Sequence, residues 1–498
     1  MRRSVVENIA WNYGGYAYQI AINLGVTAYV VRHVSVPEYG LYLLVLSISA
    51  TLYLLDMGLS NLLVQGFVAV TDEHDKSGFN QLLASSFVTL AALGLVGVAL
   101  FYGISRILPG PFNIPHAYVQ EASTLFILAS FIILAGFCSM AIEQAFRASH
   151  RFDRLSQAQL ISSTVQAAGS ITVLAMGKGI VALAAVQVGA SALQFALLVV
   201  LLPHTLDGIR LNPLHFRISI LRPFMHFGFW AFISNLSGYV FDMLVWVILG
   251  SLGTMTDAAL FGLASKAPRQ LWNMVDKGAS VALPLLSESS SETDKDTLRR
   301  MFFQTQIMVF GAVLPFVILG AMYAQPIIQL LAGAQYTRAV PVMQWLLLAA
   351  FSHAIGYASD QLLYACGEVK KAASMSFCGG ALSVLCALVL VPTYGATGLA
   401  AGVAITQLVV NGGWFTYEAC RVAEASLFDL ISELLNGLLW PLVVLITELG
   451  MVWGLSNYLS PNWLLVFAVA SGAVYLGVWG FSIALPLYRS HATAEILD

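Results

Sequence analysis

Long apolar runs alternate with short polar segments along the whole chain, and this pattern predicts about fourteen membrane-spanning helices. A helix needs about 20 mostly apolar residues to cross the hydrocarbon core of a bilayer. Runs of this kind lie near residues 9–31, 39–69, 81–103, 119–141, 157–176, 180–202, 227–250, 258–285, 302–323, 339–364, 372–391, 397–417, 433–457 and 463–487. The connections are short, so the sequence predicts an all-α integral membrane protein without a sizeable soluble domain.

One run, at residues 258–288, carries charged side chains within a stretch long enough to cross a bilayer. On a helix at about 100° per residue, its polar side chains share one stripe roughly 100° wide, with Asp276 at the edge. The members are Lys266, Arg269, Gln270, Asn273, Lys277 and Ser280. A charge at the bilayer centre costs about 2.5–3.5 kcal/mol on insertion scales, so such residues usually face a watery cavity. We interpret the run as the cationic wall of a translocation cavity. The alternative is a helix partly outside the membrane with a solvated face.

Other spans carry polar stripes without cations. The uncharged faces of the first and seventh spans hold Asn12, Tyr16, Gln19, Asn23, Asn235 and Tyr239. These side chains either line the cavity or form interhelical hydrogen bonds, which are common in membrane bundles. Carboxylates are more costly in hydrocarbon, which favours a function in ion coupling for Asp56, Asp242, and Asp360 with His353. Asp56 or Asp242 could instead pair with a cation of the eighth span.

The polar stripes on spans one and two recur on spans seven and eight. Residues 36–44 (VPEYGLYLL) and 256–264 (TDAALFGLA) open the second and eighth spans in a comparable register. Transporters built from two related halves bind substrate where the halves meet. We therefore predict two pseudo-symmetric six-helix lobes plus two extra C-terminal helices. The expected parts are an N-terminal lobe at 1–205, a cytoplasmic amphipathic linker at 206–226, a C-terminal lobe at 227–417, and the extra helices with a cytoplasmic tail at 418–498.

Composition and charge strengthen the membrane assignment and orient the chain. Hydrophobic residues make up 58% of the sequence and charged residues 10%, against about 25% charged residues in soluble domains. With fourteen spans, sixteen of the 23 Lys and Arg residues fall on the side of the N-terminus and four on the opposite side. Cytoplasmic loops carry the excess of positive charge, so we expect both termini in the cytoplasm.

Several other classes of function find little support in the sequence. The five cysteines lie within or beside apolar runs without a C-x-x-C pair, so we expect neither disulfides nor a metal site, and no cofactor. The net charge of −3 gives no reason to expect nucleic acid. Extracytoplasmic loops are short, which argues against an enzyme acting outside, and we assign no catalytic residue. The first apolar run is too long for a cleaved signal peptide.

The segment at residues 30–65 resembles the opening signature of a known family. The matching residues are Arg32, Pro37, Tyr39, Gly40, Tyr42, Asp56, Gly58 and Leu59, whereas His33 and Val34 depart from the usual pattern. In these residues the chain is similar to the Wzx-like, lipid-linked oligosaccharide flippases of polysaccharide transport, which belong to the MOP superfamily. The basic eighth span and the proline at Pro284 also resemble this family.

The resemblance implies a V-shaped cavity that opens alternately to either side. The implied cargo is an oligosaccharide on undecaprenyl diphosphate, moved from the cytoplasmic to the outer leaflet of the bacterial inner membrane, for example for O-antigen or exopolysaccharide. A polysaccharide polymerase and a chain-length regulator are implied partners. Expected diphosphate ligands are Lys266, Arg269, Lys277 and Arg32, and expected sugar-contacting or cavity-lining residues are Asn12, Tyr16, Gln19, Asn23, Asn235, Tyr239, Gln270 and Asn273.

Two other functions remain open at this point. One is a cation-coupled multidrug exporter of the MATE type, which shares the expected topology. A binder of cationic drugs should be lined with negative charge, and the positive stripe disfavours it. The other is a membrane glycosyltransferase or polymerase that acts on the same lipid carrier. Such an enzyme would need paired carboxylates or a metal-type acidic cluster on a sizeable loop.

Overall fold

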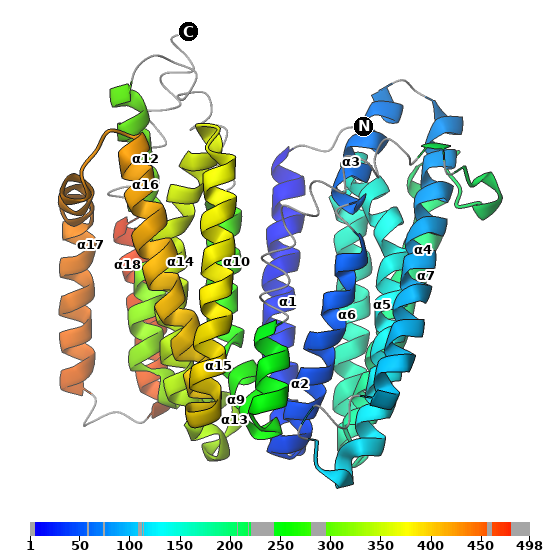
Figure 1. Ribbon diagram of the computed structural model, residues 1–498, viewed down its shortest axis with the longest axis horizontal. Coiled ribbons are helices and arrows are strands. Elements are labelled where there is room, and N and C mark those ends of the chain that lie inside the picture. The colour runs from blue at the N-terminus through cyan, green and yellow to red at the C-terminus, as the bar shows by residue number, and fades with distance from the viewer. Residues whose placement is uncertain are drawn as a thin grey trace. The chain divides into compact units, whose positions relative to one another are not determined.

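The protein is built from α-helices with short 3₁₀ and π segments, and no strand occurs in the part of the chain that the structure describes (Figure 1). The computed structural model describes residues 5–56, 59–72, 75–107, 112, 114–206, 208–217, 219–220, 244–279, 295–455 and 461–479. A helix bonds its own backbone amides and carbonyls, which a bilayer cannot do, so apolar runs of this length fold as helices. The all-α prediction is confirmed.

Contacts within the chain define a first compact unit, Met1–Ala259. Its elements are α1 (Val5–His33), α2 (Val36–Ala50), η1 (Thr51–Asp56), α3 (Leu59–Asp72), α4 (Lys76–Ile107), η2 (His116–Tyr118), α5 (Val119–Ala148), α6 (Phe152–Ala175), α7 (Ile180–Thr205) and η3 (Pro213–His215). The helix α5 lies against α2, α3, α4 and α7, and Figure 1 shows it beside α4. Aromatic rings pack against it: the buried rings of Phe101 and Phe126 lie 5.7 Å apart, and the half-buried Tyr53 lies 5.4 Å from Phe137, between centroids.

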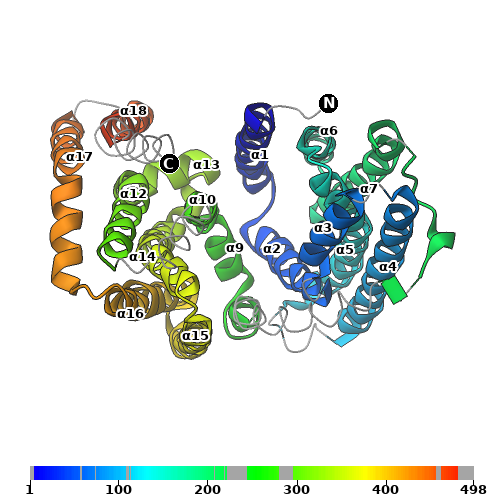
Figure 2. The same ribbon diagram turned by 90° about the horizontal axis from the view of Figure 1, so that it is seen from above.

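The second compact unit is Leu260–Asp498. It contains α10 (Lys266–Ala279), α12 (Lys295–Met322), α13 (Ala324–Ala332), η4 (Ala334–Ala339), α14 (Val340–Ala365), α15 (Val369–Gln407), η5 (Leu408–Phe415), α16 (Thr416–Val422), α17 (Leu427–Leu455) and α18 (Pro461–Trp479), and α9 (Met255–Ala264) leads into it. The helix α14 is central and packs against α10, α12, α15, α16 and η5. Figure 2 shows α10 and α17 on opposite sides of α12 and α14.

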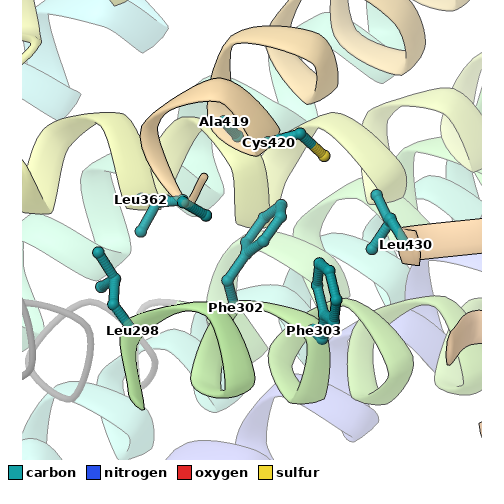
Figure 3. Packing of buried hydrophobic residues seen from close by; sticks show 8 residues of the cluster. Leu298, Phe302, Phe303, Leu362, Ala419, Cys420 and Leu430 are labelled. Carbon is teal, nitrogen blue, oxygen red and sulfur yellow. The ribbon is translucent and has the colours of Figure 1, made fainter. Parts of the chain in front are cut away.

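The C-terminal helices α17 and α18 pack on α12. An apolar cluster joins the start of α17 to the start of α12 and to the ends of α14 and α16 (Figure 3); its members are Leu298, Phe302, Phe303, Leu362, Ala419, Cys420, Ala423 and Leu430. Two ion pairs flank the cluster, Lys295 with Glu424 and Arg299 with Asp429, the latter at 2.9 Å. The start of α17 is therefore held against α12 and α16 by apolar packing and by charge.

Two predicted spans are interrupted in the structure. The run from residue 258 is not one helix, because α9 ends at Ala264 and α10 begins at Lys266 after a turn at Ser265. The cause is Pro268, which has no amide hydrogen and whose ring conflicts with the carbonyl of the residue four positions earlier. The second predicted span divides into α2, the 3₁₀ segment η1 and α3.

The long helix α15 contains a sharp bend at Gly395. Its backbone there has φ 55° and ψ −132°, outside the helical region, three residues after Pro392. Glycine adopts positive φ without the steric penalty of a Cβ. The bend falls between the spans predicted at 372–391 and 397–417, and it separates them as expected.

The same capping arrangement opens α2 and α9. Before α2, the hydroxyl and amide of Ser35 donate to the carboxylate of Glu38 at 2.7 and 3.0 Å, and the Glu38 amide donates back to the hydroxyl at 3.4 Å. Thr254 and Asp257 repeat these three bonds before α9 at 2.6, 3.0 and 3.1 Å. Both are capping boxes, in which residues three apart satisfy each other's unpaired donors. The two helices therefore begin with the same chemistry, one position out of the register that pairs residue 36 with residue 256.

In the described part of the chain, seven helices are long and apolar enough to cross a membrane. Two of the predicted spans are broken into shorter helices, two others lie within the bent region Lys370–Val422, and 221–243 is outside the described residues. The count of fourteen stays a prediction. So do the lobe and linker boundaries.

Candidate functional site

The predicted cationic stripe lies on α10, where polar and apolar side chains separate onto different faces. Leu271 and Val275 are buried, whereas Arg269 is exposed. The remaining described polar members are half-buried, namely Lys266, Gln270 and Asn273. The charged neighbour of Lys266 is a second cation, Arg269, one turn away. Two cations of like sign on adjacent turns make this end of α10 attractive to an anion.

The far end of α10 is held by α14 through a carboxylate–imidazole contact. Nε2 of His353 lies 2.9 Å from Oδ1 of Asp276, and the hydroxyl of Tyr357 donates to the backbone carbonyl of Asp276 at 3.4 Å. The Trp272 ring packs on the His353 ring with 5.2 Å between centroids. Beneath this contact, Val275 packs in an apolar cluster with residues of α12 and α14. These contacts fix the rotation of α10 about its own axis.

The expected ion-coupling group on α14 has a further partner that the sequence did not suggest. His353 contacts Asp276 of α10 and also interacts electrostatically with Asp360, which is half-buried two turns further along α14. A role for His353 or Asp360 in ion coupling stays a prediction.

Four of the predicted site residues lie in the first unit with their side chains described. Gln19 of α1 donates to Oε1 of Gln159 of α6 at 3.4 Å, which is the interhelical hydrogen bond that the sequence left open as the alternative. Asn23 is exposed on the same helix, and Arg32 is exposed in its last turn, where a cation complements the helix dipole. Asp56 is buried in η1, with 7% of its surface exposed. Their roles toward a substrate stay predictions.

The other predicted site residues lie outside what the structure describes. This applies to the whole of Asn235, Tyr239 and Asp242, and to the side chains of Asn12, Tyr16 and Lys277. The structure neither groups these residues with α10 nor separates them from it.

One polar network in the first unit was not predicted from the sequence. Nε2 of Gln194 on α7 donates to Glu143 of α5 at 3.1 Å, and the Ser162 hydroxyl of α6 donates to the Gln194 carbonyl at 3.4 Å. Arg147, one turn from Glu143, lies 3.9 Å from its carboxylate. The span predicted at 119–141 ends two residues before Glu143. The sequence signal that could have indicated this network is the acidic residue Glu143 four positions before the basic residue Arg147, a spacing that brings the two side chains together on a helix.

Comparison with known proteins identifies the family. The model of the family described as "Polysaccharide biosynthesis protein" matches residues 29–341. The chain belongs to this family. Its relatives include a putative O-antigen transporter from Shigella flexneri, which is 20% identical over 434 residues, covering 84% of this chain and 100% of that protein. The resemblance at residues 30–65 is thereby confirmed.

Solved structures of MOP-type transporters share the fold of this family member. The lipid II flippase MurJ, in an inward closed conformation, has a TM-score of 0.72 at 14% identity and covers 96% of this chain and 100% of its own. An inward-facing MATE family transporter of the MOP superfamily has a TM-score of 0.69 at 16% identity, over 82% of this chain and 96% of its own. The chain is a multi-pass membrane protein, and these solved structures show its fold. The expectation that it is not an enzyme agrees with its family and with its O-antigen transporter relative.

Proposed function

We propose that the protein flips undecaprenyl-diphosphate-linked oligosaccharide repeat units from the cytoplasmic to the outer leaflet of a bacterial inner membrane, by alternating access, for cell-surface polysaccharide biosynthesis. The O-antigen transporter relative and the flippase fold support this proposal. The observation that carries it is the pair of cations on α10, Lys266 and Arg269, with polar amides beside them. A diphosphate leaving water needs such compensating charge, and the planar guanidinium of arginine suits two phosphate oxygens at once.

In this proposal Lys266, Arg269, Lys277 and Arg32 bind the diphosphate. Sugar hydroxyls and ring faces meet the amides and aromatic rings of Asn12, Tyr16, Gln19, Asn23, Asn235, Tyr239, Gln270 and Asn273. Ion coupling falls to Asp56, Asp242, His353 or Asp360. Both termini lie in the cytoplasm, and a polymerase and a chain-length regulator take over the flipped unit.

A multidrug exporter of the MATE type is the second candidate, because a MATE transporter shares the fold over 82% of this chain. The charge of α10 separates the two candidates. A site for cationic drugs attracts its ligand with carboxylates, whereas the first turn of α10 presents Lys266 and Arg269. An anionic ligand therefore fits α10 better.

The test is the double substitution Lys266→Ala with Arg269→Ala in the full-length protein, reconstituted in proteoliposomes with fluorescent lipid-linked oligosaccharide. Hydrogen bonds to charged groups contribute about 1.5–3 kcal/mol each, and every 1.4 kcal/mol is about tenfold in affinity. We expect the flipping rate at subsaturating substrate to fall at least about tenfold.

A matched control removes the same charge elsewhere. Lys178 and Arg338 are both exposed and lie outside α10, so Lys178→Ala with Arg338→Ala should flip at the wild-type rate. Undiminished flipping by the α10 double variant, at equal protein level, would refute diphosphate capture by Lys266 and Arg269. Transport of cationic drugs by the wild type without any flipping would favour the MATE-type function.

A further inference from the structure

The carboxylate of Asp276 is exposed at the depth of the bilayer centre. Its contact His353 lies midway along α14, Val340–Ala365, within an apolar stretch that is long enough to cross a membrane. The Asp276 side chain is nevertheless 49% exposed. A carboxylate at this depth is too costly to leave against lipid, so it faces water. A polar substrate that crosses beside α10 therefore meets this carboxylate directly.

Aromatic rings from two helices surround the contact that holds this carboxylate. Oδ1 of Asp276 lies 2.9 Å from Nε2 of His353, and the Tyr357 hydroxyl donates to the backbone carbonyl of Asp276 at 3.4 Å. The His353 ring packs on the Trp272 ring at 5.2 Å and edge-on to the Tyr357 ring at 5.5 Å, between centroids. A fixed carboxylate beside aromatic rings suits a sugar, whose hydroxyls donate to carboxylate oxygens and whose C–H groups pack on ring faces.

The charge of this group determines which sugars fit it. Among the described residues, His353 contacts Asp276 and interacts electrostatically with Asp360. One imidazole cannot neutralise two carboxylates. An acidic sugar would bring a further carboxylate to Asp276, and two like charges about 5 Å apart weaken binding about four- to fifteenfold at effective dielectric constants of about 80 to 40. The group therefore favours a sugar without charge.

The position of Asp276 along α10 fits the distance between a diphosphate and the sugars attached to it. The first turn of α10 carries the proposed diphosphate ligands Lys266 and Arg269. Asp276 follows Arg269 by seven residues, which is two helical turns, about 10 Å along the axis and about 20° around it. This distance is roughly the length of a disaccharide. The end of a glycan whose diphosphate lies at the first turn therefore reaches Asp276.

We propose that Asp276 is a specificity-determining residue, which forms with the rings of Trp272 and Tyr357 a subsite for an uncharged sugar of the repeat unit and disfavours an acidic sugar there. This inference rests on the proposed function, because it takes the ligand of α10 to be a glycan linked to a diphosphate. A sugar hydroxyl donates to the carboxylate that His353 holds in place. The subsite itself needs no contact with either cation of the first turn.

The test compares two fluorescent undecaprenyl-diphosphate disaccharides that differ only in the outer sugar, glucose in one and glucuronic acid in the other. The full-length protein is reconstituted in proteoliposomes, and the ratio of the two flipping rates is measured at subsaturating substrate. We expect the wild type to flip the neutral lipid about four- to fifteenfold faster. Asp276→Asn removes the charge at nearly constant size and should lower this ratio at least about threefold. Asp276→Glu keeps the charge and should keep the preference for the neutral sugar.

The ratio separates specificity from a general loss of structure, because a damaged protein flips both lipids more slowly and leaves their ratio unchanged. An unchanged ratio in Asp276→Asn would therefore overturn the inference. The matched control is Asp296→Asn, which removes an exposed carboxylate in the first turn of α12 and should keep the wild-type ratio. If Asp276→Asn does not fold, the wild type still decides, since equal rates for the two lipids contradict the subsite. Failure of the wild type to flip either lipid would instead refute the proposed function.

Discussion

At Gly40, the absence of a side chain allows a close approach between α2 and the start of α9. A Cβ built on this residue of α2 would overlap the backbone carbonyl oxygen of Met255 and lie 3.1 Å from the amide nitrogen of Ala259, both on α9. Backbone atoms cannot move aside as a flexible side chain does. We therefore expect Gly40→Ala to separate α2 from the start of α9 and to destabilise the protein by about 1–3 kcal/mol, as overpacking typically does.

The measurement is the thermal unfolding midpoint of the detergent-solubilised protein. Gly25→Ala on α1 is the matched control, because a Cβ there meets nothing within 4 Å. Alanine is favoured over glycine inside helices by about 1 kcal/mol, so this variant should unfold at the wild-type temperature or above it. Equal midpoints for the two variants would contradict the close packing at Gly40.

For the side chains of the site, the sequence predicted which face of their own helix they occupy, but not which residues of other helices they contact. Periodicity placed Arg269 on a polar face and Leu271 and Val275 on an apolar one, and the structure agrees. It could not pair Asp276 with His353, because that contact depends on the relative register of two helices 77 residues apart. A helical period fixes directions around one axis and carries no information on which neighbour meets each face.

At the scale of helices, the sequence predicts only some of the positions at which a helix is broken. Pro268 explains the turn before α10, because proline lacks an amide hydrogen and its ring conflicts with the preceding turn. Gly395 explains the bend in α15, because glycine adopts positive φ without a steric penalty. The 3₁₀ segment η1 between α2 and α3 has no such marker within Thr51–Asp56. This segment packs against α4 and α5, and the local sequence does not encode these contacts.

The segment around η3 is held firmly along α4 and presents apolar side chains outward. The Asn80 side chain donates to the Gly208 carbonyl at 3.1 Å and accepts from the Arg210 amide at 2.8 Å. Leu214 is nevertheless 90% exposed. At 1.5 Å per residue, α4 is about 18 Å longer than the roughly 30 Å hydrocarbon core, so its first turns reach the bilayer interface. We infer that Leu214 inserts into this interface and Arg210 stays in water.

A polarity-sensitive dye on single cysteines tests this placement. In a variant without the five native cysteines, we expect the dye on Leu214→Cys to show blue-shifted emission in lipid vesicles, because it enters an apolar layer. The dye on Arg210→Cys, four residues away on the same segment, should emit as in water. Identical water-like spectra at both positions would place the whole segment in solvent.

For the whole molecule, the two-lobe repeat stays a prediction, and the helix starts show one further similarity between the segments on which it rests. Ser35 with Glu38 and Thr254 with Asp257 form the same three hydrogen bonds before α2 and α9. The boxes pair residue 35 with residue 254, whereas the sequence register pairs residue 36 with residue 256, so the two alignments differ by one position. A capping box needs only a hydroxyl residue and an acid three positions apart, so the chemistry persists where the remaining sequence has diverged.

The orientation of the chain in the membrane gives a prediction that involves both compact units. The excess of Lys and Arg on one side assigns the start of α4 to the cytoplasm and η4 to the outside. Ser77 and Thr337 are exposed at these two places. In the cysteine-free variant, Thr337→Cys should react with a membrane-impermeant maleimide on cells whose outer membrane alone is permeabilised, whereas Ser77→Cys should react only after the inner membrane is opened. The reverse labelling pattern would show that the topology is inverted. Labelling of both cysteines from the same side would mean that the chain crosses the membrane an even number of times between them. The fourteen predicted spans imply an odd number.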